Sequence, residues 1–179
     1  MVPTPHGLPV TDRWTSPRSP RDRAHPVPAS VVDMSDYPGD FTGVPDLAWA
    51  PTPDDPTPSP GEVVWARVPY EEDHTQGKDR PVLLIGQDGD WLLGLQLTSS
   101  DHDLDAEQEA QAGRRWIDIG SGAWDGKGRR SEAVVNRVVR LDPAAVRRDG
   151  AVLDERVFAA VTEALRAVAQ GRDYDDDPV

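Results

Sequence analysis

The chain has 179 residues, a formal net charge of −13, 18 prolines and no cysteine. This length fits one domain with extensions, and the lack of cysteine excludes disulfides and thiolate zinc sites. The net charge disfavours a broadly basic nucleic-acid-binding surface, although a few focused cations remain compatible with it. No apolar run is long enough for a membrane span and no secretory signal is recognisable, so we expect a cytoplasmic protein.

The first 60 residues are rich in proline, with 14 of the 18 prolines. Proline removes a backbone donor and interrupts helices and strand pairing, so this density predicts an extended, disordered arm over residues 1–60. The arm is either a passive tail or a docking segment. Its one patch with enough apolar content to dock is residues 44–50.

Strands and turns alternate from Gly61 onward. The patterns predict strands over residues 62–68, 81–87, 91–98, 114–120 and 132–141. A short acidic helix is predicted over 103–113, and a single helical turn over 142–150, opened by Asp142 and Pro143.

An amphipathic helix is predicted to close the fold over residues 154–170. Its apolar residues recur at spacings of three and four: Leu153, Val157, Phe158, Val161, Leu165 and Val168. Residues 171–179 form an acidic tail that we expect to be solvated. The element order predicts a mainly β domain over 61–170, a small open barrel with short helices at its rim.

The hairpin around residues 88–90 carries a further prediction. Leu83, Leu93 and Leu95 must share the core face, which requires odd residues to face odd residues across the hairpin. A three-residue loop at 88–90 achieves this, pairing 83 with 95 and 85 with 93. The same register sets Arg80 opposite Thr98.

Arg80 precedes Pro81, which pushes it toward an extended conformation at the mouth of the hairpin, after a polar segment predicted to be a flexible loop. Arg80 either caps the strand by pairing with Asp79 or Asp101, or is held there for function. The residues do not decide between these interpretations.

The segment from Gly61 to Thr98 resembles the MazF/PemK family of toxin ribonucleases from type II toxin–antitoxin systems. The similarity rests on the opening Gly61-Glu62-Val63, the Gln-Gly-x-x-Arg-Pro signature at residues 76–81, and the Thr98-Ser99 strand end. The late strand and closing helix are also similar, so that the resemblance covers about residues 61–169.

The resemblance implies an SH3-like barrel that forms a homodimer, cleaves single-stranded RNA or mRNA without a metal or other cofactor, and is neutralised by an antitoxin protein. It implies Arg80 and Thr98 as the catalytic pair. It further implies substrate contacts from Gln76, Gly77, Lys78 and Ser99.

The proton acceptor of such a reaction is open, with His74, His102 or neither as candidates because histidine titrates near neutrality. Three departures from the family pattern bear on activity. Asp79 lies beside the arginine, residues 101–112 are acidic, and Asn136-Arg137 replace an acid followed by glutamine.

Basic and aromatic side chains elsewhere are candidates to contact RNA. The basic ones are Lys78, Arg114, Arg115, Lys127, Arg129 and Arg130. Trp116 and Trp124 are either base-stacking residues or barrel core. The alternative function is a non-catalytic barrel that binds and inhibits a protein, as gyrase-poison toxins do, which the net acidity favours.

Overall fold

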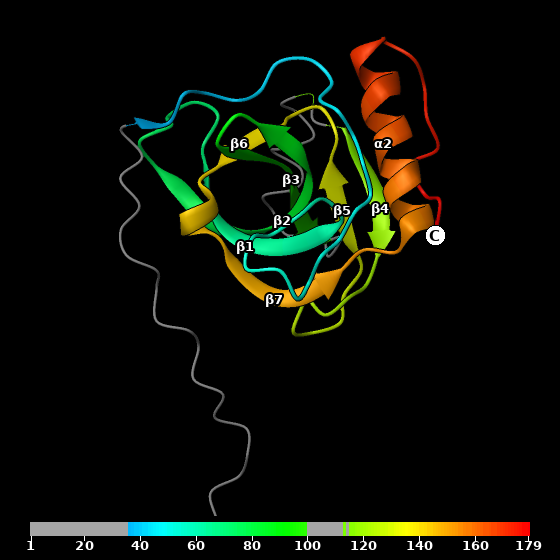
Figure 1. Cartoon of the computed structure of the whole chain (residues 1–179). Helices are drawn as coiled ribbons and strands as arrows, with labels where there is room; N and C mark the ends of the chain where they lie inside the picture. The colour runs from blue at the N-terminus through cyan, green and yellow to red at the C-terminus, as the bar shows by residue number, and fades with distance from the viewer. Residues whose placement is uncertain (1–35, 100–112, 114) are drawn as a thin grey trace, which may run out of the picture. The chain divides into compact units, whose positions relative to one another are not determined.

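The computed structural model describes residues 36–99, 113 and 115–179, and it is mainly β. Seven strands form one antiparallel, curled sheet, and the helix α2 lies against β4 (Figure 1). The elements are β1 (Glu62–Pro69), β2 (Gly77–Asp88), β3 (Trp91–Ser99), β4 (Trp116–Gly120), β5 (Ser131–Val134), β6 (Val139–Leu141), the 3-10 helix η2 (Pro143–Ala145), β7 (Arg147–Val152) and α2 (Glu155–Ala169). The fold class predicted from the sequence is confirmed.

The sheet runs in the order β4-β5-β3-β2-β1-β7, and β6 pairs with β3 on the edge that β5 also uses. Each face of the central strands buries its own apolar cluster. The larger cluster lies under α2 and includes Leu83, Ile85, Leu93, Leu95, Leu97, Phe158 and Leu165. The smaller cluster lies on the opposite face and includes Val64, Ala66, Val82, Leu84, Leu92 and Leu141.

The predicted closing helix is confirmed. Asp154 caps it by accepting a hydrogen bond from the backbone N–H of Arg156 (2.9 Å), and Gln170 ends it. Phe158, Val161 and Leu165 are buried on its inner face. The predicted acidic helix over 103–113 lies almost wholly outside the described residues.

The predicted strand 132–141 is two strands, and the prediction of one is wrong. The pairs Leu97–Ala133 and Gly94–Val139 are three residues apart on β3. On the opposite segment, from β5 to β6, they are six residues apart. The three extra residues form a bulge between β5 and β6. A helical turn does follow, but residues 147–152 form the strand β7 against β1, which the sequence prediction missed.

The hairpin register is confirmed at Leu83–Leu95 and wrong at residues 85 and 93. Asp88 pairs with Trp91, which leaves a two-residue loop whose Gly89 has a φ of 60°. This loop brings even residues opposite odd ones, and a bulge at Ile85 corrects the parity before Leu83. The leucines therefore stay in the core without the predicted three-residue loop.

Residues 36–60, here called the N-terminal strap, lie along the barrel, so the predicted disorder is wrong for this part of the arm. Phe41 pairs with Val138 (N to O, 2.8 Å), and the indole of Trp49 donates to the carbonyl of Leu153 (3.0 Å). Phe41 and Leu47 also pack against the larger cluster. Proline limits strand pairing but does not prevent side-chain packing of this kind. Residues 1–35 of the predicted arm lie outside the described residues.

Residues 171–179, the C-terminal tail, contact β4 and are not simply solvated as predicted. The backbone N–H of Asp118 donates to the carbonyl of Asp176 (2.7 Å), and the hydroxyl of Tyr174 donates to the carbonyl of Trp116 (2.9 Å). Arg130 pairs with Asp177 (3.0 Å). These contacts satisfy backbone groups on the outer edge of the sheet, where β4 has no further strand beside it.

Candidate functional site

Arg80 and Thr98 lie on the same face of neighbouring strands. On β2, Arg80 points to the same face as Val82 and Leu84 of the smaller cluster. On β3, Thr98 points to the same face as Gln96 and Leu92. Both side chains are half-buried. The face that they share is opposite to the face that packs under α2.

The ladder between β2 and β3 ends at the pair Val82–Gln96, two residues before Arg80 and Thr98. It ends next to Pro81, which has no backbone N–H to donate. Arg80 instead pairs with Ala66 of β1, and Thr98 pairs with Glu132 of β5. Arg80 and Thr98 therefore stand at the same level of the sheet but not as partners in a strand ladder.

The polar segment before Pro81 belongs to β2, so the prediction of a loop there is wrong. Residues 77–80 pair with residues 66–69 of β1, which orients Asp79 and Arg80 to opposite faces. The carboxylate of Asp79 forms an ion pair with Arg147 of β7 (2.9 Å). The acid beside the arginine is thus neutralised on the far face.

Arg80 forms no ion pair or hydrogen bond with any residue that the structure describes. The capping interpretation with Asp79 does not apply, because that carboxylate is held by Arg147. Asp101, the other candidate partner, lies outside the described residues. Among the described residues, β2 therefore presents a guanidinium without a partner on the face that also carries the Thr98 hydroxyl.

The turn before β2 is held together by Asp73. Its carboxylate accepts from the Thr75 hydroxyl (2.6 Å) and from the Gln76 side-chain amide (2.7 Å). These hydrogen bonds, that of Thr75 first, hold the pKa of Asp73 below its usual range. Gly77 is required by close packing, since a Cβ there would lie 2.4 Å from the carbonyl oxygen of Val68.

The four predicted substrate contacts do not all lie together. Lys78 is exposed on the same face as Arg80, two residues away along β2. Gln76 lies in the turn and is bonded to Asp73, and Gly77 lies at the start of the strand. Ser99 pairs with Ser131 on the face opposite to Thr98, so the structure does not bring it to Arg80.

The two histidine candidates for a proton acceptor are His74, in the turn before β2, and His102. The ring of His74 makes an edge contact with the ring of Tyr37 of the N-terminal strap, with centroids 5.0 Å apart. His74 stands at the turn end of the β1–β2 pair, beyond Gly77. His102 lies outside the described residues.

The Asn136-Arg137 departure has a structural explanation. Asn136 bonds the chain around β4, accepting from the backbone N–H of Arg115 (3.1 Å) and donating to the carbonyl of Gly113 (3.0 Å). Arg137 pairs with Asp40 of the N-terminal strap (2.7 Å) and donates to the carbonyl of Pro69 (2.9 Å). Both residues fasten neighbouring segments to the bulge between β5 and β6.

Trp124 lies in the barrel core, which was one of the two interpretations of this residue, the other being base stacking. It is 6% exposed, and its indole donates to the hydroxyl of Ser131 (3.1 Å). Trp116 is half-buried on β4, and its indole nitrogen has no hydrogen-bond partner within the described part of the chain. Among the basic candidates, Arg129 bonds Asp125 and Arg130 bonds Asp118, which ties them to the barrel.

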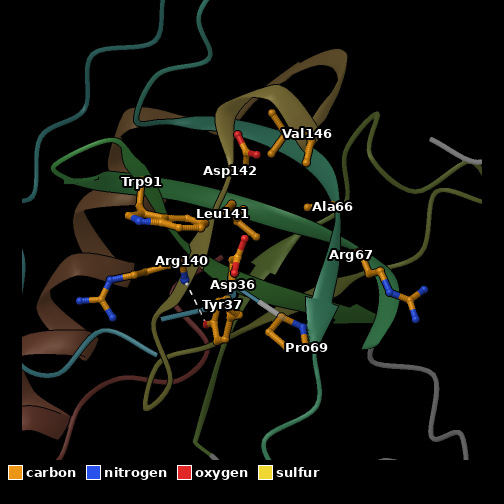
Figure 2. Close-up of a pocket in the computed structure, with 11 residues that line it drawn as sticks. Asp36, Tyr37, Ala66, Arg67, Pro69, Trp91, Arg140, Leu141, Asp142 and Val146 are labelled. Atoms are coloured by element: carbon orange, nitrogen blue, oxygen red, sulfur yellow. Dashed lines mark hydrogen bonds between the residues drawn. The ribbon is translucent and has the colours of Figure 1, made fainter. Parts of the chain in front are cut away.

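A cavity of about 160 Å³ lies between β1 and β6 (Figure 2), and Arg80 is not among its lining residues, although Ala66, its partner on β1, is. Figure 2 shows Tyr37 and Arg140 side by side at its rim, joined by the bond from the Arg140 backbone N–H to the Tyr37 hydroxyl (3.3 Å). Burial raises the pKa of Tyr37, which stays neutral and donates to Asp40 (2.5 Å). The Arg140 guanidinium is held by Asp88 (2.7 Å). These polar groups attach the N-terminal strap and leave no free reactive group among them.

Within the described ranges, no three histidine or acidic side chains gather as ligands for a metal ion. Over the same residues, no helix has the length and apolar character needed to cross a membrane.

The fold is a curled antiparallel sheet closed by one C-terminal helix, and Arg80 and Thr98 lie on the sheet face opposite to that helix. The model of the PemK-like, MazF-like toxins of type II toxin–antitoxin systems matches residues 59–169, and the chain belongs to this family. A comparison with curated proteins gives no significant match. The N-terminal strap up to residue 58 and the C-terminal tail lie outside the matched region.

Proposed function

We propose that this toxin is an endoribonuclease that cleaves single-stranded RNA in the cytoplasm without a metal ion. The observation that carries the proposal is the guanidinium of Arg80, held on a strand without a partner among the described residues, on the face that also carries Thr98. Three other arginines of the barrel, Arg137, Arg140 and Arg147, each have a carboxylate partner.

The chemistry of RNA cleavage matches these groups. When the 2′-hydroxyl attacks the adjacent phosphorus, negative charge builds on the phosphoryl oxygens. A planar, permanently charged guanidinium can donate to two of these oxygens at once. The Thr98 hydroxyl can orient the guanidinium or donate to the same oxygens. Lys78 on the same face adds a cation for the phosphate backbone.

The test is incubation of the full-length chain with a labelled library of single-stranded RNA in the presence of a chelator. We expect cleavage to products that carry a cyclic phosphate or 3′-phosphate and a 5′-hydroxyl, since the nucleophile is the 2′-hydroxyl. DNA of the same sequence lacks that group and should resist. Product ends are identified by mass spectrometry. Complete resistance of the RNA library would overturn the proposal.

A second candidate function is binding and inhibition of a protein target without catalysis. The net charge of −13 favours it, because such a surface repels RNA. The two functions separate in the same assay. An inhibitory barrel leaves RNA intact whether Arg80 is present or replaced.

We further propose that the toxin acts as a homodimer and is neutralised by a cognate antitoxin protein. One barrel of this size offers only a shallow face around Arg80 and Thr98, and two copies would form a channel for RNA. Sedimentation equilibrium at micromolar concentration is expected to give twice the chain mass. A monomer that cleaves RNA would show that no such channel is needed.

A further inference from the structure

The proposed reaction needs a group that accepts the proton of the 2′-hydroxyl. An arginine is a poor base, because its guanidinium stays protonated in proteins. The described histidine, His74, makes an edge contact with Tyr37 at the turn end of the β1–β2 pair, several residues from Arg80. Among the described residues, we therefore look for an acceptor on the face that Arg80 and Thr98 share.

Glu132 of β5 lies directly opposite Thr98 in the antiparallel ladder. Residues opposed in such a pair point to the same face, with Cβ atoms about 5 Å apart. The neighbouring pair Leu97–Ala133 is buried in the larger cluster. Thr98 and Glu132 therefore lie on the opposite face of the sheet, the face that does not pack under α2. Both are half-buried.

The three strands β2, β3 and β5 therefore carry a cation, a hydroxyl and a carboxylate at one level of one face. Paired strands lie about 5 Å apart, which sets the spacing of Thr98 and Glu132, and Arg80 stands on the other side of Thr98, two residues beyond the last pair of β2 with β3. A phosphate above Thr98 is within reach of the long arginine side chain from one side. The glutamate reaches the neighbouring ribose from the other side.

Glu132 also borders a cavity of about 570 Å³ between β4 and the C-terminal tail. The charged groups that line this cavity with Glu132 are Arg115, Asp118, Asp173, Asp176 and Asp177. Arg80, Thr98, Glu132 and Asp118 form a row across β2, β3, β5 and β4, because Asp118 of β4 pairs with Glu132. The Asp118 carboxylate accepts hydrogen bonds from Arg130 (2.9 Å) and from the backbone N–H of Gly120 (2.7 Å). Of the two carboxylates in the row, Glu132 is the one beside Thr98.

We infer that Glu132 is the general base of the cleavage reaction, an inference that rests on the proposed ribonuclease function. The proton of the 2′-hydroxyl passes to the Glu132 carboxylate while the 2′-oxygen–phosphorus bond forms. The bond from phosphorus to the 5′-oxygen breaks, and that oxygen takes a proton from water. The protonated carboxyl then returns its proton to water, so that atoms and charge balance.

The test compares full-length Glu132→Gln with the wild-type protein under single-turnover conditions. A general base contributes about 10²- to 10⁴-fold, so we expect the rate constant for cleavage to fall at least 100-fold while RNA affinity stays the same or increases. The residual rate of Glu132→Gln should rise in proportion to hydroxide concentration, whereas the wild-type rate levels off. Glu132→Asp should recover part of the rate.

Chemical rescue separates a base from a structural role. Glu132→Ala leaves space next to the cavity, and added formate should restore part of its activity by supplying a small carboxylate. Glu163→Gln on the exposed side of α2 is the matched control, because it removes one negative charge far from the row. It should cleave at the wild-type rate. Circular dichroism and thermal unfolding establish that each variant is folded.

Wild-type cleavage in Glu132→Gln, or an inactive Glu132→Ala that formate does not rescue, would overturn the assignment of Glu132. In either case cleavage by the wild-type protein, and its loss in Arg80→Ala, would leave the ribonuclease function intact. If the wild-type protein itself leaves RNA uncut, the proposed function fails and this inference fails with it.

Discussion

Replacing Arg80 by lysine is expected to lower the rate of RNA cleavage at least 100-fold although the positive charge is kept. Lysine presents a compact ammonium that cannot form two parallel hydrogen bonds to a phosphoryl group. Loss of one preorganised donor to a developing oxyanion costs about 3–4 kcal/mol, or roughly 10²- to 10³-fold in rate. The single-turnover rate constant at saturating enzyme measures this effect without interference from RNA binding.

The matched control for this variant is Arg67→Lys. Arg67 lies on β1, one position from the partner of Arg80, and its side chain is exposed on the opposite face. It should cleave RNA as the wild-type protein does. Thr98→Ala is expected to lose less activity than Arg80→Lys, and Thr98→Ser least, because a hydroxyl remains. Equal rates for Arg80→Lys and the wild-type protein would remove Arg80 from the chemistry.

The sequence predicted the parts of the barrel that local patterns determine. The closing helix has an Asp154 cap and apolar residues at helical spacing, and the β2–β3 hairpin has a glycine turn between apolar strands. Both signals are contained in short windows of sequence. The prediction of Arg80 and Thr98 on one face followed from the same alternation, and the pairing of Leu83 with Leu95 confirms that part of the register.

The features that the sequence did not predict depend on contacts between distant residues. Arg137 and Asp40 are 97 positions apart, and nothing in either local pattern indicates that they pair. The strand β7 has the composition of a charged turn, and its pairing with β1 overrides that local preference. Glu132 was hidden in the same way, because only the ladder between β3 and β5 brings it opposite Thr98.

The position of Asp79 illustrates how one register decides the chemistry of a site. In the sequence, Asp79 is adjacent to Arg80 and suggests either a pair or repulsion of RNA. In β2 the two side chains point to opposite faces, and Arg147 neutralises the carboxylate. Because neighbouring residues of a strand point to opposite faces, Asp79 does not pair with Arg80. Their adjacency in the sequence alone would have suggested that it does.

Asp40→Ala is expected to lower the free energy of unfolding by about 3 kcal/mol, a large effect for a residue within a proline-rich segment. The Arg137 side chain is only 8% exposed, and it donates to Asp40 through two nitrogens, at 2.7 and 3.2 Å. Removal of one partner leaves a largely buried cation without its counter-ion, which typically costs about 3–5 kcal/mol. Tyr37 also loses the acceptor of its hydroxyl.

The loss has a natural limit, because the N-terminal strap can detach and let water reach Arg137. We therefore expect Asp40→Ala to have a lower Tm, by about 10 °C at roughly 2–4 °C per kcal/mol for a domain of this size. Limited proteolysis should then cut within residues 36–60, which the wild-type protein protects. Asp46→Ala removes the same charge from an exposed position of the strap and serves as the control. Equal Tm values and equal cleavage patterns for Asp40→Ala and the wild-type protein would show that the strap contributes nothing to the stability of the barrel.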